Sequence, residues 1–93
     1  VIDARSLAPL DMPTIVESVG RTGRLIVVHE APVVGGLGAE IAAEITQECF
    51  YQLESPVLRV GGFHAHYPPS RIEDIYLPDL DRILDAVDRS MTY

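Results

Sequence analysis

The segment from Arg24 to Glu30 contains four consecutive apolar residues, Leu25 to Val28. A strand with one face in water alternates apolar and polar side chains, whereas a parallel strand covered on both faces carries a continuous apolar run. The run therefore predicts a strand in a parallel sheet that lies between two layers of helices.

Strand-like and helix-like segments alternate along the whole chain. The strand-like segments are 1–4, 24–30 and 57–60. The helix-like segments, which carry apolar residues three or four positions apart, begin at Asp11, near Ala39 and after Asp79. The first is expected to end at Gly20 or Gly23 and the second at Leu53, and a long loop is expected over 63–78. This alternation predicts an α/β fold with right-handed crossovers and helices on both faces of the sheet.

The composition is that of one globular domain spanning residues 1–93, with 47% hydrophobic and 23% charged residues. The net charge of −7 argues against a nucleic-acid surface, which needs a basic patch, and favours basic protein partners. Cys49 has no second cysteine to pair with, so nothing indicates an oxidising compartment. No apolar run approaches the ~20 residues of a membrane span, so we expect no membrane association.

The glycine-rich stretch from Gly35 to Glu40 lies between a strand and a helix, where such loops can hold a phosphate against helix amides. The dinucleotide-binding pattern fails, because its third glycine would fall at Ile41. Glu40 in the first turn would also repel an anion. A tight turn with close helix packing is therefore the favoured interpretation, and an anion site is the alternative.

Two pairs of residues are candidates for chemistry. His29 and Glu30 stand at the carboxyl end of the central strand, where open parallel sheets usually place their sites. Neighbouring strand residues point to opposite faces, so a structural role is favoured over acid–base catalysis. His64 and His66 could bind a metal, but zinc sites need three or four protein ligands. With no self-sufficient catalytic or metal-binding set, the sequence favours an interaction or assembly role.

Several short motifs resemble, in the same order, the C-terminal, transketolase-like domain of the beta subunit of 2-oxo acid dehydrogenases. The motifs are TGRL at 22–25, HEAP at 29–32, GLGAEIA at 36–42, SPVLRV at 55–60 and YLP at 76–78. HEAP and the ECF at 48–50 resemble the branched-chain type more than the pyruvate type. One departure is the GFHAH at 62–66, where relatives usually have Gly-x-Asp-x-Pro, so His64 and His66 replace an Asp and a Pro.

The resemblance implies a three-layer α/β/α sandwich with a mostly parallel sheet and one antiparallel strand. It also implies that this chain lacks the first strand and helix of the domain, which agrees with a start at Val1 without Met and with only three predicted strands. Family members bind thiamine diphosphate with magnesium between the alpha subunit and an earlier domain of the beta subunit. No catalytic or cofactor-binding residue is therefore expected on this chain.

The resemblance further implies an assembly role. In related enzymes this domain pairs with the second beta subunit, belongs to an assembly with the alpha subunit, and docks the small basic subunit-binding domain of the acyltransferase core. The docking residues correspond here to Glu54, in the turn Leu53 to Pro56, and to the terminal Tyr93. A cytoplasmic location, or the mitochondrial matrix in a eukaryote, is expected. The alternatives are a pyruvate dehydrogenase beta subunit and a freestanding small anion-binding domain.

Overall fold

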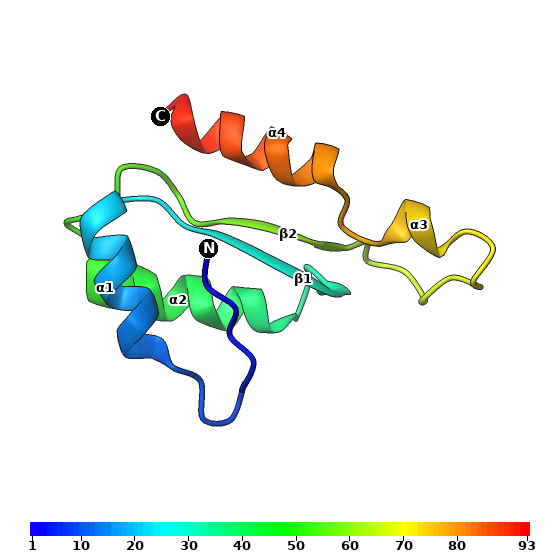
Figure 1. Ribbon diagram of the computed structural model, residues 1–93, viewed down its shortest axis with the longest axis horizontal. Coiled ribbons are helices and arrows are strands. Elements are labelled where there is room, and N and C mark those ends of the chain that lie inside the picture. Colours follow the sequence, from blue (N-terminus) through cyan, green and yellow to red (C-terminus); the bar gives the residue numbers. More distant parts are fainter.

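Two parallel strands form the centre of the computed structural model, which describes residues 1–93 (Figure 1). The elements in chain order are α1 (Met12–Thr22), β1 (Ile26–Pro32), α2 (Leu37–Cys49), β2 (Leu58–Gly62), α3 (Glu73–Tyr76) and α4 (Leu80–Met91). In the register of the sheet, Ile26 lies opposite Leu58 and Val28 opposite Val60, with an irregularity before Pro32 and Gly62 pair. Strands β1 and β2 and the helices between and after them confirm the predicted α/β class.

The helices cover both faces of the sheet. Helices α1 and α2 lie together on one side, and α4 runs along the other side (Figure 1). This arrangement gives the three layers that the sequence predicts. None of the helices is both long and apolar enough to cross a membrane.

The polar residues at the helix ends act as the sequence predicts. The Asp11 side chain accepts from the Thr14 amide at 3.2 Å, and the Asp79 side chain accepts from the Arg82 amide at 2.8 Å, which satisfies amides that have no partner within the helix. Helix α1 ends at Gly23, whose φ of 70° is the left-handed conformation that favours glycine. Of the two predicted stops, Gly23 is the one used.

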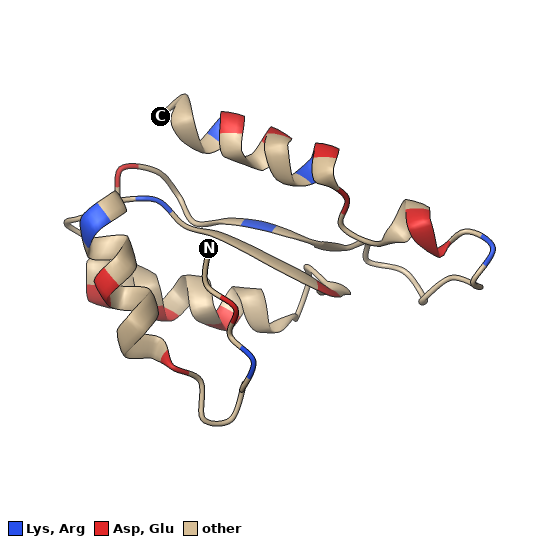
Figure 2. Cartoon of the chain, viewed as in Figure 1, with Lys and Arg blue, Asp and Glu red and all other residues tan.

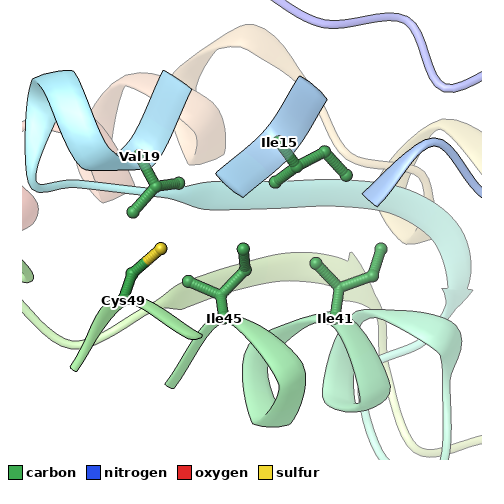
Figure 3. Packing of buried hydrophobic residues seen from close by; sticks show 5 residues of the cluster. All are labelled: Ile15, Val19, Ile41, Ile45 and Cys49. Atoms are coloured by element: carbon green, nitrogen blue, oxygen red, sulfur yellow. The ribbon is translucent and has the colours of Figure 1, made fainter. Parts of the chain in front are cut away.

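The core lies between α1 and α2. Figure 3 shows Ile15 and Val19 of α1 pointing toward the apolar stripe of α2. That stripe consists of Ile41, Ile45 and Cys49, and Ile45 is fully buried. Leu53, just after α2, packs against the same cluster from outside the helix. The predicted apolar stripe is therefore confirmed, with Cys49 acting as a small apolar side chain.

Two strand predictions need correction. Residues 1–4 form no strand, because the segment makes no ladder hydrogen bonds to β1. It instead borders an apolar cavity of about 700 Å³, with side chains of α1 and β1 on the other walls. The nearest pairing, and the only antiparallel one, is an isolated bridge between Leu7 and Leu10. Val28 is 45% exposed, so the apolar run of β1 is not covered on both faces.

Two other boundaries differ from the expectation. Helix α2 ends at Cys49 rather than Leu53, and residues 50–52 form a turn, with the amides of Gln52 and Leu53 both donating to the Cys49 carbonyl. The loop over 63–78 contains the single helical turn α3. Tyr76 at the end of that turn is buried, and its hydroxyl donates to the Phe63 carbonyl at 3.4 Å.

Candidate functional site

His29 fills the space at the carboxyl end of β1. Its Nδ1 lies 2.8 Å from the Ala31 carbonyl oxygen, whereas its Nε2 is buried with no hydrogen-bond partner. A Cβ placed on Gly36, Gly38 or Gly61 would come within 2.8–2.9 Å of the imidazole. The ring is therefore enclosed by glycine backbone from the α2 entry and from β2.

This packing explains the glycine-rich stretch and leaves little for catalysis at His29. Glu30 is exposed and forms no ion pair or hydrogen bond with His29, so the two are not an acid–base pair. A ligand cannot reach the buried Nε2 of His29, whose ring fills the space beside Gly36 and Gly38. The predicted tight turn with close packing is confirmed by these contacts. They also argue against the anion site at Gly35–Glu40.

His64 and His66 are both exposed on the loop before α3. No group of three or more histidine, cysteine, aspartate or glutamate side chains in the chain is arranged to hold a metal ion. The structure therefore does not bring these two residues into a site with other candidates.

The same loop is organised by aromatic residues and one arginine. The rings of Phe63 and Tyr67 each meet Tyr76 edge to face, with centroids 6.1 Å and 5.2 Å away. Arg82 at the start of α4 lies over the Phe63 ring, 4.8 Å from its centroid. Its guanidinium also donates to the carbonyls of Gly61 and Tyr76, so one side chain joins β2, the loop and α4.

Tyr67 is the titratable group whose environment clearly perturbs it. Its hydroxyl donates to the Glu73 carboxylate at 3.0 Å. That hydrogen bond to Glu73 is the largest cause that raises the pKa of Tyr67 above its ordinary value, and partial burial and the nearby negative charge add to it.

Glu54 lies in an exposed turn that is fixed to the end of α1. Its amide donates to the Gly23 carbonyl at 2.8 Å, and its carboxylate Oε2 accepts from Nη1 of Arg24. The Glu54 side chain is 62% exposed, whereas that of Arg24 is 23% exposed. The acidic group that the sequence singled out therefore faces solvent beside a half-buried arginine.

The end of α4 lies at the same place. Nε of Arg24 donates to the Ser90 carbonyl at 3.1 Å, and the Ser90 hydroxyl lies 3.1 Å from that of Ser55 in a buried contact. Figure 1 shows the α2–β2 connection and the C-terminal end of α4 at one end of the molecule. Tyr93, three residues after Ser90, is 65% exposed. We call the surface formed by Glu54 and Tyr93, together with Arg24 and the buried Ser55 and Ser90 beneath it, the docking edge, after the role that the sequence analysis predicts for Glu54 and Tyr93.

Sequence reasoning predicted Glu54 and Tyr93 but missed Arg24 and the two serines. In the sequence, Arg24 is a polar residue at the start of a predicted strand. Ser55 and Ser90 are 35 positions apart. Only the folded chain brings them together. Negative charge does not mark the docking edge either, because acidic residues are spread over α1, α2 and α4 (Figure 2).

Comparison with known proteins adds a family and several relatives. Residues 1–83 match the family described as transketolase, C-terminal domain. The chain is 58% identical over 89 residues to the 3-methyl-2-oxobutanoate dehydrogenase subunit beta of Mycobacterium tuberculosis, which covers 96% of this chain and 26% of the relative. It is 53% identical over 93 residues to the pyruvate dehydrogenase E1 component subunit beta of Leifsonia xyli, covering all of this chain and 28% of the relative.

A plant protein extends the comparison. The chain is 46% identical over 93 residues to the mitochondrial 2-oxoisovalerate dehydrogenase subunit beta 2 of Arabidopsis thaliana, covering 100% of this chain and 26% of the relative. The chain thus spans about a quarter of the length of these curated relatives.

Proposed function

The chain belongs to the transketolase C-terminal domain family, and we propose that it is the assembly and partner-docking domain of the beta subunit of a branched-chain 2-oxo acid dehydrogenase. The parent enzyme would decarboxylate a 2-oxo acid oxidatively and pass the acyl group to a lipoyl group. Relatives named as beta subunits of such enzymes, from a bacterium and a plant mitochondrion, support the proposal. We also propose that the subunit pairs with an alpha subunit and a second beta subunit, and that the parent enzyme is located in the cytoplasm.

The branched-chain assignment is favoured over pyruvate dehydrogenase by two observations. The branched-chain relative from Mycobacterium tuberculosis has the higher identity of the two bacterial relatives described above. The HEAP motif at 29–32, whose His29 fills the space between the glycines, also resembles the branched-chain type more than the pyruvate type. The substrate pocket itself is proposed to lie in other parts of the enzyme.

The observation that carries the docking role is the joining of Glu54 to the end of α4. An exposed carboxylate and the exposed Tyr93 belong to two elements that Arg24 and the Ser55–Ser90 contact hold together. A basic partner domain, such as the subunit-binding domain of the acyltransferase core, suits this edge and the net charge of −7. Such charge complementarity raises the association rate and fixes orientation.

The residues of this chain do not fit thiamine diphosphate with magnesium. A magnesium ion is held by carboxylate and other oxygen ligands, and the chain offers no suitable cluster of acidic side chains. The glycine stretch before α2 is occupied by the imidazole of His29. We therefore propose that the cofactor of the parent enzyme is bound by residues outside this chain and that the chain itself is not catalytic.

Reversing the charge of Glu54 tests the docking role. In the assembled enzyme, Glu54→Arg is expected to weaken binding of the acyltransferase subunit-binding domain by about 2 kcal/mol, because a carboxylate desolvated against a basic partner is replaced by a repelling cation. Titration calorimetry at moderate salt measures the dissociation constant. Glu44→Arg on the middle of α2 makes the same change in net charge and should leave binding nearly unchanged. Equal affinity of the Glu54→Arg enzyme and the unmodified enzyme would refute the assignment.

A further inference from the structure

We infer that Arg24 is a positioning residue for the docking edge: it orients the Glu54 carboxylate so that one oxygen is left for a cationic side chain of the partner. This inference rests on the proposed docking function and concerns the same surface. It assigns a role to a residue that carries no negative charge and whose own charge opposes a basic partner.

The first support is the geometry of the guanidinium. Two nitrogens of Arg24 donate to acceptors on two different segments of the chain. Nε donates to the Ser90 carbonyl at 3.1 Å, and Nη1 donates to Oε2 of Glu54. With 23% of its side chain exposed, Arg24 lies beneath Glu54, which is 62% exposed. The planar fork of an arginine therefore fixes the Glu54 carboxylate relative to the last turn of α4.

The second support is that the backbone of the turn is held independently of Arg24. The Glu54 amide donates to the Gly23 carbonyl at 2.8 Å, and the buried hydroxyls of Ser55 and Ser90 are 3.1 Å apart. A Cβ on Gly23 would lie 2.8 Å from Cγ of Glu54, so the turn sits directly on the end of α1. Removing the guanidinium should therefore free the carboxylate without releasing the turn.

The third support is the chemistry of the carboxylate. An ionised carboxylate accepts hydrogen bonds on both oxygens. Arg24 occupies Oε2 of Glu54, and Oε1 accepts no hydrogen bond in the chain. The partner that fits is therefore a lysine or arginine side chain that shares the carboxylate with Arg24, in a charge-assisted hydrogen bond to Oε1.

The direction in which one substitution changes the binding affinity distinguishes this role from simple electrostatics. Arg24→Gln removes a positive charge that repels a basic partner, so electrostatics alone predicts tighter binding. Positioning predicts the opposite: about a tenfold rise in the dissociation constant for the basic subunit-binding domain, the size of a typical coupling between contacting residues. Arg24→Lys, which keeps the charge and can still reach one acceptor, should recover part of the affinity.

The experiment is a double-mutant cycle in the assembled enzyme, with the subunit-binding domain as the probe. Arg24→Gln should weaken binding when Glu54 is present and should no longer weaken it in a Glu54→Gln enzyme. Arg71→Gln, at an exposed position in the loop before α3, removes the same charge and should leave affinity unchanged. Thermal unfolding of each variant shows that it is folded.

Two results overturn the inference. One is unchanged or tighter binding of the Arg24→Gln enzyme. The other is equal weakening by Arg24→Gln with and without the Glu54 carboxylate, which would assign Arg24 to the fold alone. If Glu54→Arg also leaves affinity unchanged, the docking proposal itself fails. If Glu54→Arg weakens binding and Arg24→Gln does not, only the role of Arg24 fails.

Discussion

His29 explains why several glycines stand where they do. Its ring occupies the space that a Cβ of Gly36, Gly38 or Gly61 would need. Those glycines are therefore required for close approach of backbone to side chain. The residue pair that looked most like acid–base chemistry in the sequence is in this structure a packing arrangement at the end of a strand.

Two glycine substitutions test this packing. In Gly38→Ala the new methyl group would lie 2.8 Å from Nε2 of His29, so we expect a loss of about 1–3 kcal/mol in the free energy of unfolding from overpacking. The control Gly20→Ala lies within α1 with nothing within 4 Å, and it should stabilise the chain by about 0.5–1 kcal/mol. Denaturant titration measures both. Equal effects of the two substitutions would contradict the packing role.

The hydrogen bond from Tyr67 to Glu73 predicts a pH dependence. The neutral phenol donates to the carboxylate, and its ionisation would break this bond and place two anions together, which raises the pKa of Tyr67. The stabilisation of the loop is therefore complete below the pKa of an unfolded tyrosine and is lost as pH rises through the higher pKa of the folded state. Glu73→Gln should lower the pKa of Tyr67, measured from the Cζ chemical shift. An unchanged titration curve would show that the bond is not the cause.

The sequence predicted residues whose function depends on near neighbours in the chain. Asp11 and Asp79 were identifiable as helix caps because a cap binds an amide three positions away. Arg24 was not identifiable, because its acceptors on Glu54 and Ser90 lie 30 and 66 positions away. The docking role of Glu54 is predicted only from the family resemblance, since an exposed glutamate in a turn has no physical signature of docking.

The helices could be predicted from the local sequence pattern, whereas the edges of the sheet could not. Apolar spacing places α1, α2 and α4, because a helix satisfies its own backbone, and side-chain caps mark the starts of α1 and α4. A strand needs a neighbour, and residues 1–4, three of which are apolar, have no ladder partner. Helix α2 stops early for a tertiary reason: the turn after Cys49 brings the Glu54 amide to the Gly23 carbonyl.

Arg82 ties the loop over 63–78 to the rest of the fold. Arg82→Met keeps the apolar stem but leaves the carbonyls of Gly61 and Tyr76 without this donor, and each loss of a partner costs about 1–3 kcal/mol where the group is buried. We expect faster amide hydrogen exchange across 63–78 and unchanged exchange in α2. Arg82→Lys should have a smaller effect. Exchange rates that do not differ between loop and helix among these variants would contradict the role of Arg82.

The two ends of the sheet differ in what they present to solvent. Parallel sheets usually place their sites at the carboxyl ends of the strands. Here that end is filled by His29 and by the aromatic loop that Arg82 holds. The exposed Glu54 carboxylate lies at the other end, where the turn before β2 meets the last residues of α4. This arrangement supports the proposal that the domain presents an edge to a partner.

Mapping the surface that the partner protects tests the docking proposal directly. Amide hydrogen exchange of the assembled enzyme, with and without the basic subunit-binding domain of the acyltransferase, reports protection along the chain. We predict slower exchange at Gly23–Arg24, Glu54–Ser55 and the last turn of α4, with no change from His29 to Gly38. Protection confined to the carboxyl ends of the strands or to the loop over 63–78 would contradict it.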